Sequence, residues 1–146
     1  MSTDLKMLAL TSALTVMLWL PYIVAHIVKY GLIPALTYSA DGRELPGWAE
    51  RARKAHYNAI ENLAPFAALV LVAHASGTAS AATATAATVY FWARVAHFAA
   101  YVSGIPFGRT LTFAVGWAMM LWIFAEIVGF GAEAVAQAFP MLTVLA

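Results

Sequence analysis

The chain has 146 residues, of which 63% are hydrophobic and only 10% are charged, and its formal net charge is +1. Soluble domains are about half apolar and about a quarter charged, so this composition, with a mean hydropathy of +0.78, excludes an ordinary soluble fold. The small net charge argues against a nucleic-acid partner, and the absence of cysteine excludes disulfides, thiolate metal ligands and a cysteine nucleophile.

Four apolar stretches are long enough to cross a bilayer, which takes about 20 residues in a helix. They cover about residues 5–30, 48–75, 79–103 and 109–130, and a short tail follows at 131–146. The first stretch is too long for the apolar part of a signal peptide, so we expect it to be retained. Since no repeat or linker divides the chain, we expect one all-α domain, an integral membrane four-helix bundle.

Prolines and small residues within these stretches indicate where a helix kinks and where two helices approach closely. Pro21 lies inside the first stretch and Pro65 inside the second, where it is expected to kink the helix and free a backbone carbonyl. The third stretch opens with an Ala/Thr run at 79–88, and such small residues allow membrane helices to approach closely.

The basic residues predict the orientation in the membrane. Four of them lie in the first connection and at the start of the second stretch: Arg43, Arg51, Arg53 and Lys54. Arg109 lies in the third connection, whereas the second connection and the tail contain no Lys or Arg. By the positive-inside rule, we expect loops one and three to be cytoplasmic and both termini periplasmic, in a bacterial inner membrane.

Two stripes of polar side chains fall inside the expected membrane spans. The second stretch places three of them on one helical face: Lys54, Asn58 and Glu61. The third stretch places four on one face: Tyr90, Arg94, His97 and Tyr101. Both stripes lie in the expected cytoplasmic half, so we expect them to meet at one depth. Polar groups in this environment are costly and indicate function.

The charges of the two stripes favour an anionic ligand. Glu61 and Arg94 are the obvious ion pair, and the cations around them outnumber the carboxylates, which suits a small anion. From the residues alone, a purely structural Glu61–Arg94 pair is an equally good interpretation. Arg51 and Arg53 by themselves fit topology signals and lipid-headgroup contacts better than ligand contacts. The histidines lack the compact spacing of metal ligands, so no metal site is predicted.

Two segments resemble signatures of one membrane-protein family. Residues 50–66, ERARKAHYNAIENLAPF, resemble the second-helix signature of the MAPEG family, the membrane-associated proteins in eicosanoid and glutathione metabolism. The signature is a basic stretch, an Asn, a Glu three residues later, and Pro-Phe. Residues 93–101, ARVAHFAAY, resemble the third-helix signature, especially in the branch of microsomal glutathione transferases and prostaglandin E synthases.

This resemblance implies a homotrimer that binds glutathione as cosubstrate between subunits and acts as a transferase, peroxidase or isomerase on lipophilic electrophiles from the bilayer. It also implies the residues that bind glutathione, which are Lys54, Asn58, Glu61, Arg94, His97 and Tyr101. Arg109 matches the catalytic arginine that stabilises the glutathione thiolate. This agrees with the chemistry, because a guanidinium lowers the pKa of a thiol from about 8.5 and remains charged when partly desolvated.

Two functions stay open on the sequence alone. The first is a glutathione-dependent membrane enzyme. The second is a non-catalytic trimer of the same fold that binds lipids or a partner protein. Tyr57 favours the second, because it stands where the prostaglandin synthase branch has a ligand-binding arginine. A transporter is disfavoured, since the sequence shows no pair of interrupted spans.

Overall fold

A computed structural model describes residues 1–130, and these residues form helices and turns without a strand. The long helices are α1 (Thr3–Met17), α2 (Leu20–Tyr30), α4 (Gly47–Ala75), α5 (Ala81–Ser103) and α6 (Gly108–Val128). Two short elements, α3 (Leu32–Leu36) and the 3-10 turn η1 (Tyr38–Ala40), connect α2 to α4. The predicted tail at 131–146 lies outside the described residues.

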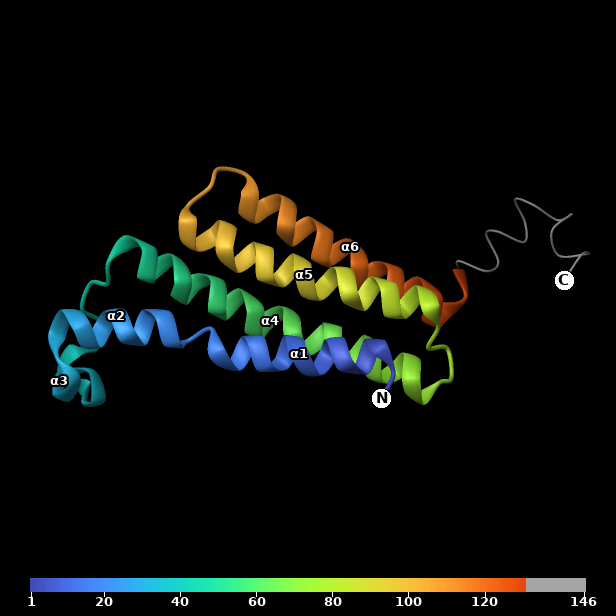
Figure 1. Ribbon diagram of the computed structural model, residues 1–146, viewed down its shortest axis with the longest axis horizontal. Coiled ribbons are helices and arrows are strands. Elements are labelled where there is room, and N and C mark those ends of the chain that lie inside the picture. Colours follow the sequence, from blue (N-terminus) through green and yellow to red (C-terminus); the bar gives the residue numbers. More distant parts are fainter. Residues whose placement is uncertain (131–146) are drawn as a thin grey trace, which may run out of the picture.

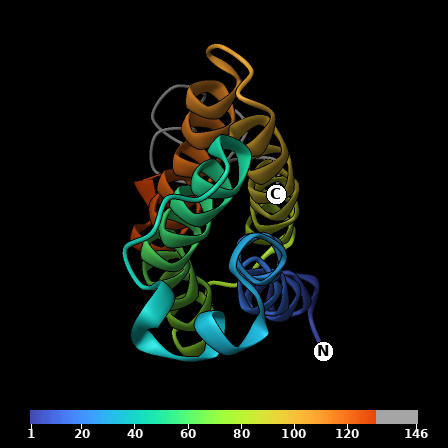
Figure 2. The same ribbon diagram turned by 90° about the vertical axis from the view of Figure 1, so that its left-hand side faces the viewer.

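The long helices form an elongated bundle of four rods. α1 and α2 follow one another end to end beside α4, and α5 and α6 form an antiparallel hairpin on top of them (Figures 1 and 2). α5 packs against α1, α4 and α6, so it is largely surrounded by other helices. This arrangement confirms the prediction of an all-α helical bundle.

Within residues 1–130, three helical segments are both long and apolar enough to cross a membrane: the α1–α2 rod, α4 and α6. The chain is therefore an integral membrane protein. α5 does not meet the same criterion of composition, but its 23 residues span about 35 Å and it runs alongside the other rods. Its position in the bundle supports the expected fourth span, and burial among other helices accommodates its polar residues.

The two prolines in the apolar stretches act differently. The predicted single helix at 5–30 is interrupted, because α1 ends at Met17 and α2 begins at Leu20, with Pro21 in its first turn. Pro21 has no N–H to donate to the Met17 carbonyl, and its ring would clash with that carbonyl, so the helix stops and restarts. α4, in contrast, continues through Pro65.

Aromatic stacking and small residues hold the rods together. The rings of Phe66 on α4 and Tyr90 on α5 stack with their centroids 3.8 Å apart, and both side chains are fully buried. The Tyr90 hydroxyl donates to the Asn62 carbonyl at 3.0 Å, close to Pro65. Ala86 and Ala87 are fully buried, which agrees with close helix approach along the Ala/Thr run.

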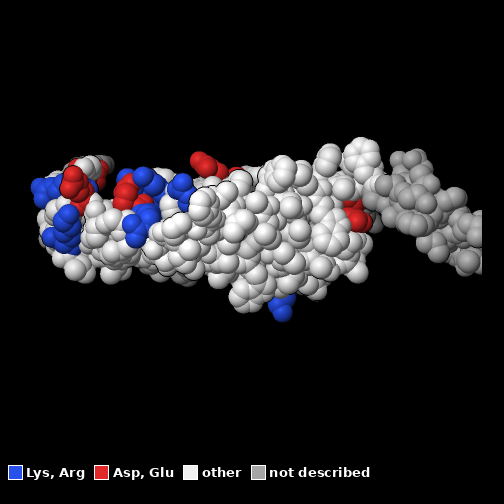
Figure 3. Space-filling model, turned by 90° about the horizontal axis from the view of Figure 1, so that it is seen from above, with Lys and Arg blue, Asp and Glu red and all other residues white. Residues whose placement is uncertain are grey.

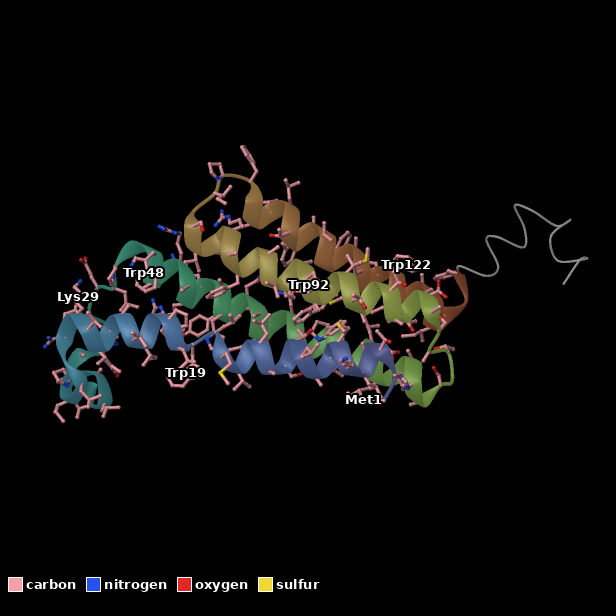
Figure 4. The ribbon with its side chains drawn as sticks, in the orientation of Figure 1. Met1, Trp19, Lys29, Trp48, Trp92 and Trp122 are labelled. Atoms are coloured by element: carbon pink, nitrogen blue, oxygen red, sulfur yellow. The ribbon has the colours of Figure 1, made fainter. Side chains whose placement is uncertain are left out.

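Most charged side chains gather at one end of the bundle, and only a few isolated charges lie along the rest of its length (Figure 3). This end carries the first connection and the turn between α5 and α6 (Figure 1). The first connection is held in place by Lys29 and Tyr30, whose side chains donate to the Glu44 carbonyl at 2.7 and 2.6 Å. Lys29 and Trp48 mark this end in Figure 4. We refer to it below as the loop end.

Candidate functional site

Arg94 on α5 lies where three helices meet. Its side chain is buried, with a relative exposure of 4%. The Nη1 atom donates to Asn58 Oδ1 on α4 at 3.4 Å, and Nη2 donates to the carbonyls of Thr112 and Phe113 on α6, also at 3.4 Å. The contact with Asn58 confirms that the polar stripes of α4 and α5 meet at one depth.

The predicted ion pair between Glu61 and Arg94 is wrong within the described chain. Glu61 is exposed and forms no salt bridge within residues 1–130. The reason is helix geometry: Lys54 and Glu61 are rotated about 40° and about 60° in the same direction from Asn58, toward the outside of the bundle. Asn58 therefore stands at the inner edge of the stripe and reaches Arg94, whereas Glu61 faces outward.

Gly116 on α6 makes room for Arg94. A Cβ atom added at Gly116 would lie 2.4 Å from Arg94 Nη2 and 3.0 Å from its Nε and Cζ. The Arg94 guanidinium also lies over the rings of Tyr90 and Phe113, at 5.3 and 5.5 Å from their centroids. Sequence reasoning did not identify Gly116. The available signal was a lone glycine inside an apolar span, where small residues mark close contacts.

His97 docks α5 onto the start of α6. Its side chain is buried, and Nδ1 lies 2.9 Å from the Arg109 carbonyl and 3.1 Å from Thr112 Oγ1. Because the Arg109 carbonyl can only accept, we assign the proton to Nδ1. Nε2 is then an acceptor, and this buried atom has no hydrogen-bond partner among the described residues. His97 can therefore accept one more hydrogen bond.

Arg109 and Tyr101 stand between two cavities near the loop end. The Arg109 guanidinium is exposed and lies 5.4 Å from the centroid of the Tyr101 ring. The inner cavity, of about 260 Å³, is bounded also by His97 and Phe113. The outer cavity, of about 440 Å³, is bounded also by Arg51 from α4. Neither cavity has an acidic residue in its described lining, so both suit an anionic group.

Arg51 is a second residue that the sequence analysis did not place in a site. Its Nε donates to the Val102 carbonyl at 2.9 Å, which ties the start of α4 to the end of α5. The signal was its spacing, because Arg51 precedes Asn58 by two helical turns and lies nearly in line with it. The sequence alone assigns Arg51 to topology signals and lipid-headgroup contacts rather than to a ligand site.

The structure separates the seven predicted site residues into two groups. The first group forms a connected set across α4, α5 and α6: Asn58, Arg94, His97, Tyr101 and Arg109. The second group, Lys54 and Glu61, lies on the exposed face of α4. The Lys54 ammonium is 4.0 Å from Glu50, which pairs more closely with Arg53 at 2.8 Å.

Comparison with known protein families identifies the chain. The model of the MAPEG family matches residues 7–129, from the middle of α1 to the residue after α6. The chain belongs to the MAPEG family. Membership supports a membrane protein of eicosanoid or glutathione metabolism. No curated protein and no solved structure shows significant similarity to the chain.

This MAPEG protein has a third, apolar cavity of about 530 Å³ between α4 and α6. It begins at Asn62 and Pro65 and continues along Trp117, Leu121 and Phe124, away from the loop end. The Asn62 side chain donates to the Asn58 carbonyl at 2.8 Å, so the apolar cavity starts one helical turn from the polar group. The polar group and the apolar cavity are thus adjacent in this MAPEG chain.

Proposed function

We propose that the chain is a glutathione-dependent membrane transferase or peroxidase for lipophilic electrophiles, and that its site is completed between subunits of a homotrimer. One observation carries the proposal: the exposed Arg109 guanidinium lines two cavities whose described lining contains no acidic residue. A cation in this position favours a bound anion, and the anion that the family chemistry supplies is a thiolate.

The proposed chemistry needs a thiolate near neutral pH. A free thiol ionises with a pKa of about 8.5, and an adjacent guanidinium stabilises the ionised form. In a transfer reaction, the sulfur forms a bond to the electrophilic carbon and the leaving group departs with its electron pair. In a peroxidase reaction, the sulfur takes one peroxide oxygen and an alcohol is released. A second glutathione then yields the disulfide and water.

Glu61 supports a ligand with an ammonium group. A carboxylate inside a membrane span is costly unless a cation pairs with it, and Glu61 has no such partner within residues 1–130. In our proposal, the glutathione ammonium pairs with Glu61 and a glutathione carboxylate with Lys54. A neighbouring subunit covers this face of α4. Asn58, Arg94, His97 and Tyr101 form the polar wall behind the ligand.

The first test is thermal unfolding of the detergent-purified protein with increasing reduced glutathione. A ligand at 100-fold its Kd that binds only the folded state adds about 2.7 kcal/mol. We expect a saturable rise in Tm that Glu61→Ala abolishes. Arg109→Ala should retain most of the rise but lose turnover with an alkyl hydroperoxide or an aryl halide. No rise at millimolar glutathione would reject the proposal.

A second candidate function is favoured by the apolar cavity. In this alternative, a homotrimer of the same fold binds a lipid or a partner protein without catalysis. The 530 Å³ cavity between α4 and α6 has the volume and the lining for an acyl chain. Lipid that copurifies with the protein, combined with unchanged cellular activity of Arg109→Ala, would favour this alternative over the enzyme.

A further inference from the structure

The turn between α5 and α6 contains a strained aromatic residue. Phe107 has φ of 61°, and it is the only non-glycine residue with positive φ among residues 1–130. Its side chain is 80% exposed, and the neighbouring Ile105 is 55% exposed. A bulky residue is rare in this left-handed region, and backbone strain that is retained there indicates a function. A glycine would relieve the strain, but it could not supply an aromatic side chain.

Directly beside this turn lies the outer cavity of about 440 Å³. Arg51 enters it from α4 and Arg109 from α6, and Pro106 and Phe107 belong to its apolar wall. The bond from Arg51 Nε to the Val102 carbonyl fixes the Arg51 side chain. Its two terminal nitrogens donate no hydrogen bond within residues 1–130. Two guanidiniums without a carboxylate form a site for a phosphate or carboxylate group.

The position of the turn points to the membrane surface. In Figure 1 the turn between α5 and α6 ends short of α2 and α3, which extend farther in the same direction. Most charged side chains gather at this end of the bundle (Figure 3), as expected where helices leave the lipid core for the headgroup layer. Exposed Ile105 and Phe107 beside two arginines combine apolar and positively charged side chains, which suits the boundary between the headgroups and the acyl chains.

We propose that the outer cavity binds the phosphodiester of an anionic phospholipid from the surrounding leaflet. Arg51 and Arg109 contact the phosphate, and Phe107 and Ile105 pack against the first methylenes of the acyl chains. The exposed apolar side chains favour a lipid over a free anion, because a free anion would leave them in water. This site shares Arg109 with the proposed thiol site, but it requires no catalysis.

Native mass spectrometry of the full-length protein tests this site by titration with phosphatidylglycerol or the zwitterionic phosphatidylcholine. Both lipids offer the same phosphodiester, but the choline cation of phosphatidylcholine is repelled by two guanidiniums, so we expect the wild type to bind phosphatidylglycerol about tenfold more tightly. Arg51→Gln should remove this preference. Arg53→Gln is the matched control, since Arg53 pairs with Glu50 outside the cavity, and it should retain the preference.

Phe107→Gly separates lipid contact from folding. This change relieves the strained φ, so we expect a Tm in lipid-free detergent equal to or above that of the wild type. Binding of both lipids should weaken because the aromatic contact is lost. Equal binding of both lipids by the wild type, or wild-type binding by Arg51→Gln and Phe107→Gly, would overturn the proposal.

Two competitors distinguish the other sources of an anion. If millimolar inorganic phosphate displaces phosphatidylglycerol, the cavity is a site for a free anion and the lipid assignment is wrong. If reduced glutathione displaces it from the wild type and Arg51→Gln has also lost the glutathione-induced rise in Tm, the cavity is the thiol site itself, and the lipid assignment is again wrong. A glutathione-induced rise in Tm that persists in Arg51→Gln would show that the variant folds and that Arg51 belongs to the lipid site alone, with Arg109 shared.

Discussion

The guanidinium of Arg94 lies directly against the backbone of α6 at Gly116, where an added Cβ would stand 2.4 Å from Nη2. This close approach explains how a cation can be buried in the bundle without a carboxylate partner among residues 1–130. Because Gly116 has no side chain, Arg94 reaches the carbonyls of Thr112 and Phe113, and these oxygens share its charge with Asn58. Gly116 is therefore a positioning residue for Arg94.

The first prediction concerns Gly116→Ala. In an open helix, this change usually stabilises by about 1 kcal/mol, because alanine favours the helix. Here we expect the opposite sign, a loss of about 1–3 kcal/mol from overpacking against the buried guanidinium. Thermal unfolding in detergent measures the difference.

Gly47→Ala is the matched control for this change. A Cβ at Gly47, the first residue of α4, would meet Arg51 at 3.6 Å, which is an ordinary contact. We expect its Tm to stay close to that of the wild type. A Gly116→Ala protein as stable as Gly47→Ala would show that Arg94 does not require the close approach.

The second prediction concerns the opposite end of the bundle. Asp4 in the first turn of α1 is 3% exposed, and its Oδ2 lies 2.9 Å from Nε2 of His74 in the last turn of α4. Removing one partner of a buried pair leaves the other uncompensated. His74 is partly exposed, so we expect Asp4→Asn to cost about 1–3 kcal/mol, less than for a fully buried pair.

Lys6→Gln is the control at this end, because Lys6 is exposed and follows Asp4 two residues later in the same helix. We expect a change within about 0.5 kcal/mol for that surface substitution. A double-mutant cycle with His74→Gln isolates the coupling energy of the pair. Additive effects of the two single substitutions would mean that the contact does not stabilise the fold.

The third prediction separates the two nitrogens of His97. An asparagine amide can take the position of Nδ1 and donate to the Arg109 carbonyl, but it offers nothing at the position of Nε2. We therefore expect His97→Asn to keep most of the stability. His97→Leu loses the hydrogen bond between α5 and α6, although Thr112 Oγ1 still donates to the same carbonyl at 3.2 Å, so we expect a cost of about 0.5–1.5 kcal/mol. Unfolding in detergent gives both values.

Glutathione binding tests the other nitrogen of His97. If Nε2 accepts a hydrogen bond from the ligand, His97→Asn should weaken glutathione binding by about tenfold while the protein stays folded. Wild-type affinity in this variant would restrict His97 to a structural role between α5 and α6.

The sequence predicts the helices well because their signals are local. A long apolar stretch, a proline or a glycine acts through its own neighbours, so most helices and the connections between them could be placed from the residues alone. The break at Pro21 was not predicted, since the stretch at 5–30 was expected to form one helix. A proline that ends one helix and starts the next gives the same apolar pattern as one inside a continuous helix, as Pro65 in α4 shows.

The candidate site was harder to predict because its contacts join different helices. Helical spacing correctly placed Asn58 and Arg94 at one depth, but it could not show that Glu61 turns away from the bundle. Whether Arg94 pairs with Glu61 or with the α6 carbonyls depends on the rotation of α4 about its axis and on the space at Gly116. Neither is encoded in the spacing of a single helix.

The last prediction tests the chemistry that we assign to Arg109. If its guanidinium stabilises the bound thiolate, Arg109→Ala should lower kcat by about 10²-fold or more at neutral pH, as the loss of a preorganised charge contact does. The ionisation of bound glutathione would then return toward a pKa of about 8.5, so activity should recover as the pH rises through that value. Arg109→Lys retains a positive charge without the planar fork, and we expect intermediate rates. Rates measured from pH 6 to 9.5 distinguish the two roles of Arg109. If the arginine only binds glutathione, its removal should raise KM and leave the pH profile of kcat unchanged.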